Sequence, residues 1–261
     1  MNTETITSND LVPKVIHYVW LGGGNLTPSA KRCINSWRKI MPDYQIKCWD
    51  ESNFDINSVP WVKEAIEKKK WSLASDYIRF YALYTEGGIY MDTDVMVFKP
   101  FTEFLKYDVF TSIECHPAIF NKEGVYDIDD DGFPLNNPVR GLGLLAALIG
   151  AKCGNLYIKE CMDFFGNRHF IKEDGTLFID IINPAIMPMI ALKYGFRFKD
   201  CDQYLEKNIK IFSSSIFASD ILLRTKESYS MHYSDNSWVE KTVFGKMKSY
   251  IKAYCLPFLK R

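Results

Sequence analysis

The sequence predicts an α/β fold in which a twisted, mostly parallel β-sheet lies between helices. Residues 15–21 form a near-continuous apolar run that ends in three glycines, as expected of a buried parallel strand followed by a turn that approaches a ligand closely. A helical pattern over residues 28–41 and a second strand over 44–49 follow. Strand, helix and strand within roughly forty residues make a βαβ unit, which predicts a parallel sheet.

Length and composition favour one large globular domain, 1–261, without nucleic-acid binding. The chain has 261 residues, of which 47% are hydrophobic, and 32 basic residues balance 32 acidic ones. Nucleic-acid-binding domains are normally basic, so the zero net charge argues against that class of partner. Seven cysteines without a C-x-x-C pair predict reduced thiols in a cytoplasmic protein. The polar first fourteen residues, MNTETITSNDLVPK, and the lack of any run near ~20 apolar residues predict neither a signal peptide nor a membrane-spanning helix.

Two aspartates lie between two apolar runs that resemble β-strand, residues 89–91 and 95–98. Because side chains alternate along a strand, we expect Asp92 and Asp94 to point to one face and Thr93 to the other. Two carboxylates on one face repel each other unless a cation lies between them. Paired oxygen ligands suit Mg²⁺ or Mn²⁺. A solvated, aspartate-rich turn is the alternative interpretation.

A helix is predicted upstream, because Leu73, Tyr77, Phe80 and Tyr84 recur at helical spacing and two glycines, Gly87-Gly88, follow. On this helix Asp76 and Arg79 are three residues apart and therefore share a face. A surface ion pair is the alternative explanation for the two.

These elements form one compound motif. Ser75-Asp76-x-x-Arg79 is followed by Gly87-Gly88-x-Tyr90-x-Asp92-x-Asp94. The block resembles the core of glycosyltransferase family 32, the polysaccharide mannosyl-, galactosyl- and related transferases. It is also similar to the glucosylating domains of the large clostridial toxins. The resemblance implies a GT-A type fold, a nucleotide-sugar donor and a divalent metal.

The resemblance also implies roles for individual residues. It implies that Trp20, in an Ile-His-x-x-Trp-x-Gly-Gly pattern, lies against the base of the nucleotide. It implies direct metal binding by Asp94, ribose or metal-shell contacts by Asp92, and hydrogen bonds from a sugar or ribose hydroxyl to Asp76. The remaining donor-site residues that it implies are Arg79, as a fixed cation on the sugar or phosphate, and Tyr90.

A histidine near the end of the chain completes the predicted metal site. A lone histidine is more often structural than a ligand. His232, however, stands six residues before Trp238, and this arrangement resembles the end of many metal-dependent transferases of the GT-A fold. The predicted metal ligands are therefore Asp92, Asp94 and His232, with Mn²⁺ or Mg²⁺ as the cofactor.

The second half of the chain is less informative. The acids from Asp127 to Asp131 lack the downstream glutamate of a calcium loop, so a loop on the acceptor side is the favoured interpretation. Residues 141–151 are small and apolar, which predicts a buried strand or helix under the site. The candidates to contact the donor sugar are Asn136, Asn137, Asp180 and Asn183.

The predicted organisation is a nucleotide-sugar-binding half, 12–100, an acceptor-side half, 101–240, and a basic amphipathic tail, 241–261. The tail either lies on an anionic membrane surface or packs as a C-terminal helix. The predicted function is transfer of a hexosyl unit from a nucleotide-sugar, with a UDP-sugar favoured, to a glycan or lipid-linked oligosaccharide in capsular or other surface-polysaccharide biosynthesis. The resemblance implies retention of anomeric configuration and a bacterial protein that is cytoplasmic or peripheral at the inner face of the plasma membrane.

Two other function classes stay open at this point. Asp-x-Asp after an apolar strand also resembles the haloacid-dehalogenase phosphotransferases. Those enzymes need the motif near the chain start and a later lysine and acidic pair, which the sequence does not place convincingly. The other class is a non-catalytic glycan- or membrane-binding protein with a decayed site, against which the intact Asp76, Arg79, Asp92 and Asp94 argue.

Overall fold

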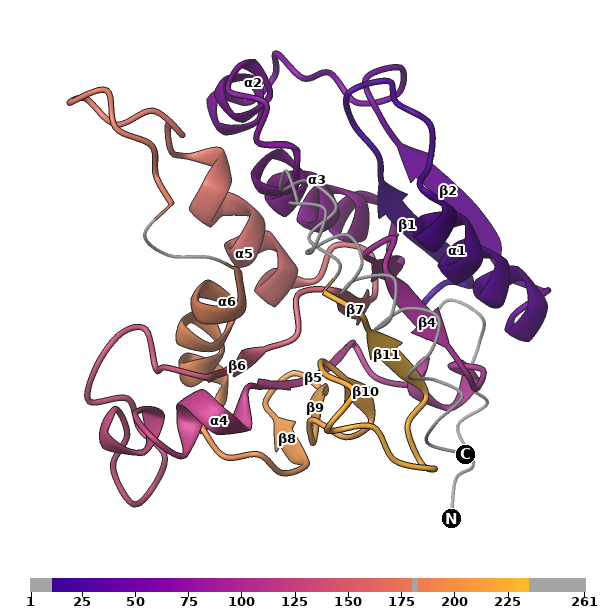
Figure 1. The fold of residues 1–261 in the computed structure, drawn as a ribbon. Coiled ribbons are helices and arrows are strands. Elements are labelled where there is room, and N and C mark those ends of the chain that lie inside the picture. The colour runs from indigo at the N-terminus through magenta and orange to yellow at the C-terminus, as the bar shows by residue number, and fades with distance from the viewer. Residues whose placement is uncertain (1–10, 180–182, 235–261) are drawn as a thin grey trace.

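The structure is a computed structural model that describes residues 11–179 and 183–234 (Figure 1). Asp180, Trp238 and the tail 241–261, which the sequence singled out, lie outside the described residues. None of the helices described is both long enough and apolar enough to cross a membrane.

A large β-sheet forms the centre, in the order β2-β1-β3-β7-β5-β9-β8, with β6 paired to β5. Its strands are β1 (Val15–Val19), β2 (Gln45–Trp49), β3 (Gly88–Met91), β5 (Val109–Cys115), β6 (Leu142–Leu144), β7 (Leu148–Ala151), β8 (Gln203–Leu205) and β9 (Ile209–Phe212). β1 is parallel to β2 and β3, which confirms the predicted βαβ unit, and β5 is parallel to β9. β7 runs antiparallel between β3 and β5, so the sheet is mixed. β3 and β5 consequently point the same way.

A second, smaller sheet lies beside the first and consists of β10 (Phe217–Ala218), β11 (Ser230–His232) and β4 (Val95–Val97), in that order. The helices are α1 (Pro28–Ile40), α2 (Pro60–Glu67), α3 (Trp71–Glu86), α4 (Pro117–Phe120), α5 (Leu156–Gly166) and α6 (Asn183–Ala191). Three 3₁₀ turns, η2 (Thr102–Phe104), η3 (Gly124–Tyr126) and η4 (Leu192–Tyr194), complete the described elements. The α/β prediction is confirmed.

Helix α1 connects β1 to β2 and also fixes the small sheet. It begins where the Thr27 side chain accepts a hydrogen bond from the Ala30 amide at 3.1 Å, with proline at the first helical position. Its buried face includes Trp37, whose indole N–H donates to the Val95 carbonyl at 2.7 Å. The Ser36 hydroxyl accepts from the Val97 amide at 3.0 Å. Strand β4 is thereby held against α1.

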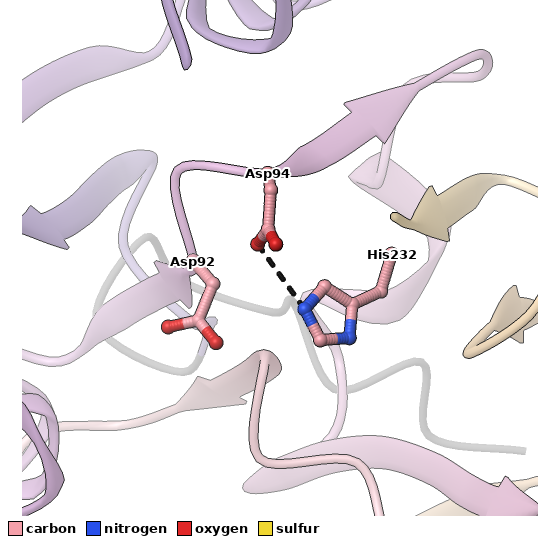
Figure 2. Close-up of side chains that lie close together, drawn as sticks. All are labelled: Asp92, Asp94 and His232. Atoms are coloured by element: carbon pink, nitrogen blue, oxygen red, sulfur yellow. Dashed lines mark ion pairs between the residues drawn. The ribbon is translucent and has the colours of Figure 1, made fainter. Parts of the chain in front are cut away.

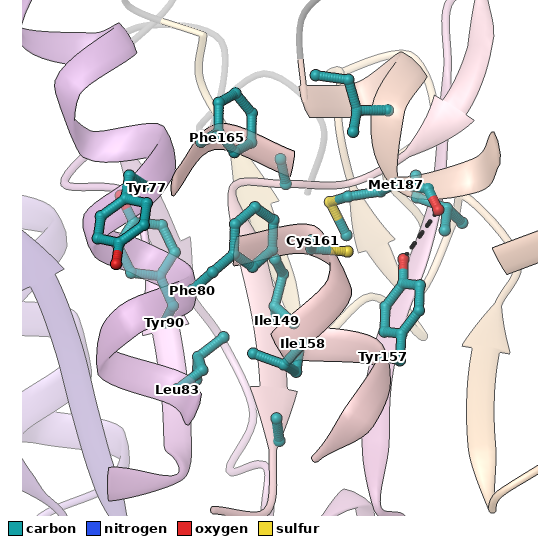
Figure 3. Packing of buried hydrophobic residues seen from close by; sticks show 14 of the residues in the cluster. Tyr77, Phe80, Leu83, Tyr90, Ile149, Tyr157, Ile158, Cys161, Phe165 and Met187 are labelled. Atoms are coloured by element: carbon teal, nitrogen blue, oxygen red, sulfur yellow. Dashed lines mark hydrogen bonds between the residues drawn. The ribbon is translucent and has the colours of Figure 1, made fainter. Parts of the chain in front are cut away.

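Helix α3 is the most deeply buried helix of the first half, because it packs between α5 and the sheet. Figure 3 shows Phe80 and Leu83 of α3 facing Ile158 of α5 and Ile149 of β7. The helix ends at Gly87, whose φ of +66° suits glycine, and a Cβ there would lie 2.7 Å from the Cys153 amide nitrogen. The glycine stop expected from the sequence is confirmed. The small-residue segment predicted as strand or helix forms the two strands β6 and β7.

The acidic loop between β5 and β6 is closed by one ionic network. Asp127 is buried, and its carboxylate accepts hydrogen bonds from the Arg140 guanidinium at 2.7 and 2.8 Å and from the Asn136 amide at 3.0 Å. These bonds, with Arg140 first, lower the pKa of Asp127 well below its ordinary value. The Arg140 guanidinium therefore neutralises the buried carboxylate of this loop.

The core around α3 provides a stability prediction. Phe80 is fully buried and stacks on Phe165 with ring centroids 6.2 Å apart. Phe80→Ala should lower the free energy of unfolding by about 3–5 kcal/mol, measured by urea denaturation. The control Leu156→Ala, at a side chain 61% exposed, should change it by less than about 0.5 kcal/mol. Equal effects for the two variants would contradict this account of the core.

Candidate functional site

A cavity of about 580 Å³ opens where β1, β3 and β5 end. Parallel strands bring their carboxyl ends to one edge of a sheet, which is where α/β proteins bind ligands. The residues that line it are Val19, Trp20, Leu21, Thr27, Trp71, Ser72, Ser75, Arg79, Tyr90, Asp92, Thr93, Asp94, Glu114, His116, His232 and Ser234. The structure thus brings together Trp20, Arg79, Tyr90, Asp92, Asp94 and His232 of the predicted site, while Asp76 does not line the cavity.

The two aspartates belong to a turn between two sheets. β3 ends at Met91 and β4 begins at Val95, and the Val95 amide donates to the Asp92 carbonyl at 3.0 Å. The expectation that strand alternation places both side chains on one face was therefore wrong in its geometry. The side chains still converge, because the tight turn redirects the chain from the large sheet into the small one.

His232 reaches this turn through strand pairing. β11 is antiparallel to β4, and His232 is the register partner of Val95, next to Asp94. Its Nε2 lies 3.1 Å from Asp94 Oδ1 (Figure 2). One ligand atom from each of Asp92, Asp94 and His232 lies within 4.8 Å of the other two. Two carboxylates and an imidazole in this arrangement fit a divalent cation.

The charge state of His232 depends on the same acids. Burial lowers its pKa, but Asp94, Asp92 and Glu114 outweigh burial and raise it to about 9. In the cation-free protein the protonated imidazole therefore offsets part of the carboxylate charge. A metal ion must displace that proton, because only a neutral imidazole nitrogen binds metal.

Arg79 organises the acidic side of the cavity from within α3. It donates to the Ala146 carbonyl at 2.7 Å and to Asp76 Oδ1 at 2.8 Å, and it lies 3.8 Å from Asp92 Oδ1. Its guanidinium also stacks over the Tyr90 ring at 4.7 Å, and the Tyr90 hydroxyl donates to Asp92 Oδ1 at 2.7 Å. One oxygen of Asp92 is thus held in place by two neighbours before any ligand binds.

Asp76 lies behind Arg79, away from the cavity lining. It is 7% exposed, and the Asn183 amide donates to its Oδ1 at 2.7 Å. Burial raises its pKa to about 6, although Arg79 opposes the rise. This geometry favours Asp76 as a residue that positions Arg79, while its direct contact with a sugar or ribose hydroxyl stays a prediction.

Two tryptophans lie at the other end of the lining. The Trp20 indole donates to the Gly24 carbonyl at 2.6 Å, which fixes the ring against the glycine turn, while its contact with a base stays a prediction. Trp71, the first residue of α3, packs under Gly22, where an added Cβ would lie 3.2 Å from its ring. No sequence motif indicated a role for Trp71, although it opens the motif-bearing helix.

The asparagines proposed to contact the donor sugar lie outside the cavity lining. Asn136 is bound to Asp127, and neither it nor Asn137 lines the cavity. Asn183 is buried behind the cavity on Asp76. In contrast, Glu114 and His116 at the end of β5 do line it, and no motif indicated them. The signal that could have found them is their position at the carboxyl end of a predicted strand.

Residues 27–111 match the family model described as "Glycosyltransferase sugar-binding region containing DXD motif". This confirms the family resemblance predicted from the compound motif. Among curated proteins, the chain is 33% identical over 93 residues to inositol phosphoceramide mannosyltransferase 3 of Schizosaccharomyces pombe. The aligned segment covers 32% of this chain and 24% of that relative. It is 31% identical over 101 residues to the uncharacterized glycosyltransferase L373 of Acanthamoeba polyphaga mimivirus, covering 36% of this chain and 40% of the relative. The chain thus matches well under half the length of these curated relatives.

Solved structures with some similarity include the PaToxG glycosyltransferase, with a TM-score of 0.45, 16% identity and 70% coverage of each chain. The galactosyltransferase LgtC in complex with donor and acceptor sugar analogs has a TM-score of 0.43 and 14% identity, covering 92% of this chain and 95% of that one.

The raised pKa of His232 predicts how cation affinity depends on pH. Below about pH 9 the cation-free histidine carries a proton that Mn²⁺ must displace, so affinity should rise about ten-fold per pH unit between pH 6 and 8. Manganese titrations followed by electron paramagnetic resonance of free Mn²⁺ measure this. In His232→Ala the affinity should be roughly 10–100-fold lower and its pH slope shallower. An unchanged slope would remove His232 from the metal site.

The Tyr90 hydroxyl provides a second prediction. Tyr90→Phe removes the hydrogen bond to Asp92 but keeps the ring that Arg79 stacks on. Losing a group that orients a ligand should weaken Mn²⁺ binding about ten-fold or more. Tyr84→Phe, on α3, is the matched control. Equal Mn²⁺ affinities for the two variants would show that Tyr90 does not orient Asp92.

Proposed function

We propose that this chain is a metal-dependent glycosyltransferase that moves a hexosyl unit from a nucleotide-sugar to a glycan acceptor. The observation that carries the proposal is the convergence of Asp92, Asp94, His232 and Arg79 in one cavity. Of these, Arg79, Asp92 and Asp94 lie in the segment 27–111 that matches the DXD sugar-binding region. The same match favours this class over a haloacid-dehalogenase-like phosphotransferase. The proposed cofactor is Mn²⁺ or Mg²⁺.

The shape of the cavity supports a nucleotide-sugar as the ligand. Its volume of about 580 Å³ falls within the roughly 300–1,000 Å³ of small-molecule sites. Trp20 and Trp71 offer ring faces to a base, and the acidic cluster lies where a cation would hold the diphosphate. A UDP-sugar is the proposed donor, with the Trp20 ring against uracil.

In the proposed reaction an acceptor hydroxyl oxygen forms a bond to the anomeric carbon of the donor sugar. The bond from that carbon to the diphosphate oxygen breaks, and the nucleoside diphosphate leaves with the electron pair and takes up the hydroxyl proton. A bound cation would neutralise the negative charge of this leaving group. Asp94 and His232 would hold the cation, and Arg79 and Tyr90 hold Asp92 in position for it. Retention of configuration is proposed from the family resemblance, without a named nucleophile.

The acceptor class is proposed from the relatives. The mannosyltransferases of Schizosaccharomyces pombe are named for an inositol phosphoceramide, a lipid that carries a polar head group. Their names support an acceptor that is attached to a lipid. A lipid-linked glycan, in surface-polysaccharide assembly at the inner face of a membrane, is the acceptor that we propose. They also make GDP-mannose the strongest rival to a UDP-sugar donor.

Thermal unfolding with nucleotides tests the proposal. UDP at about 100 times its Kd, with Mn²⁺, should raise the melting temperature by roughly 5–10 °C, and GDP should not. Asp94→Asn should abolish the shift, because it removes a charge that holds the cation. Asp130→Asn, at an exposed acid of the β5–β6 loop, is the control that should keep the shift. Stabilisation by GDP-mannose alone would overturn the donor assignment, and no shift with any nucleotide would overturn the function.

A further inference from the structure

A second cavity, of about 200 Å³, adjoins the first. The two cavities share Glu114 and His116 in their linings. The rest of the second cavity is formed by the end of the β5–β6 loop, by β6 and by the first turn of α6, namely Pro138, Val139, Arg140, Gly141, Leu142, Gly143, Pro184 and Ala185. It therefore belongs to the part of the chain beyond residue 100.

Glu114 is the carboxylate at the boundary between the two cavities. It is the one residue of β5 that is not fully buried, with 16% of its side chain exposed. Among residues 11–179 and 183–234, its ion-pair partner is His116, whose Nε2 lies 3.4 Å away. A carboxylate offers about four lone-pair sites. Glu114 therefore keeps capacity to accept hydrogen bonds from a ligand in either cavity.

The opposite walls are apolar and closely packed. A Cβ on Gly143 would lie 2.1 Å from the Pro184 carbonyl oxygen, so β6 and α6 meet at backbone distance. Gly141 has a φ of +74°, and a Cβ there would lie 2.6 Å from the Phe120 amide. Arg140 is held by Asp127 and Glu123. The shape of the second cavity is therefore set by the protein rather than by a ligand.

We propose that the second cavity binds the acceptor sugar and that Glu114 accepts a hydrogen bond from the acceptor hydroxyl that attacks the donor. The inference rests on the proposed transferase function. An acceptor oxygen must reach the anomeric carbon, so an acceptor cavity has to open into the donor cavity, as this one does beside Glu114 and His116. The volume is below the roughly 300 Å³ of drug-sized sites, which suits one sugar ring. The apolar walls suit the C–H face of such a ring.

Ala185 is the best position at which to fill the second cavity, because it is half-buried on α6 and does not line the first. The assay uses UDP-glucose and UDP-galactose with Mn²⁺ and a panel of methyl glucosides, galactosides and mannosides. It measures transfer to the glycoside and hydrolysis of the donor by water in the same reaction. Ala185→Trp should lower the ratio of transfer to hydrolysis by about ten-fold or more. Leu222→Trp, at a side chain 75% exposed, should leave the ratio unchanged.

Glu114 variants test the hydrogen bond itself, and they also cover the case in which Ala185→Trp does not fold. Glu114→Leu removes the acceptor atoms and should raise the KM for the glycoside at least about ten-fold. Glu114→Gln keeps one acceptor oxygen and should restore part of that loss. If Glu114 had only a structural role, its variants would change the KM for the glycoside and the KM for the donor to a similar extent. Saturation-transfer NMR with the same glycosides, in the presence of UDP and Mn²⁺, measures acceptor binding directly.

The outcomes separate the acceptor cavity from the proposed transferase function. Donor hydrolysis with an unchanged transfer ratio in Ala185→Trp would overturn the acceptor cavity and leave the proposed function standing. The absence of both transfer and NMR binding for every glycoside, with UDP binding intact, would do the same. If UDP does not bind and no UDP is released from UDP-glucose or UDP-galactose, the proposed function fails, and the acceptor inference fails with it.

Discussion

The structure depends on how it balances four carboxylates in and directly behind one cavity. Asp92 and Glu114 act on both cations, Arg79 and His232, while Asp76 acts on Arg79 and Asp94 acts on His232. Although burial alone lowers the pKa of Arg79, its anionic neighbours raise that pKa above its ordinary value, so Arg79 is a permanent charge. The charge of His232 is exchangeable, because it depends on a proton. The arrangement therefore has one fixed cation and one position where a metal ion would compete with a proton.

The geometry of that second position depends on the small sheet. The Asp92–Asp94 turn leaves the large sheet and enters β4, and β4 is held by Trp37 and Ser36 of α1 on one side and by β11 on the other. Pairing with β11 brings His232 beside Asp94, although the two are far apart in the sequence. The candidate metal site is thus a product of the turn between the two sheets and of strand pairing in the small one, and the residues that stabilise β4 support the site from outside the cavity.

Local patterns were enough to predict much of this. The βαβ unit and α3 with its glycine stop follow from periodicity and turn residues, and Asp92 and Asp94 follow from the compound motif. His232 was predicted because its spacing to Trp238 resembles the end of GT-A transferases, and it lies beside both aspartates. The turn at Thr93 could not be predicted, because β-branched and apolar neighbours look the same whether a strand continues or changes sheets. The burial of Asp76 beneath Arg79 likewise depends on Asn183, which α6 brings from much later in the chain. The position of Glu114 at the end of a predicted strand is visible in the sequence, but its place beside a second cavity depends on the packing of β6 and α6, which no local pattern records.

The same long-range packing ties the two predicted halves together. Arg79 belongs to the segment 12–100, yet one of its strongest hydrogen bonds goes to the Ala146 carbonyl, in the connection between β6 and β7. β6 forms a wall of the second cavity, and β7 pairs with β3, the strand that leads into the aspartate turn. The donor side and the proposed acceptor side are therefore built on shared strands, with no linker between them in the described chain. An acceptor in the second cavity would lie against the same backbone that holds Arg79, and so at a fixed distance from the charges that position the donor.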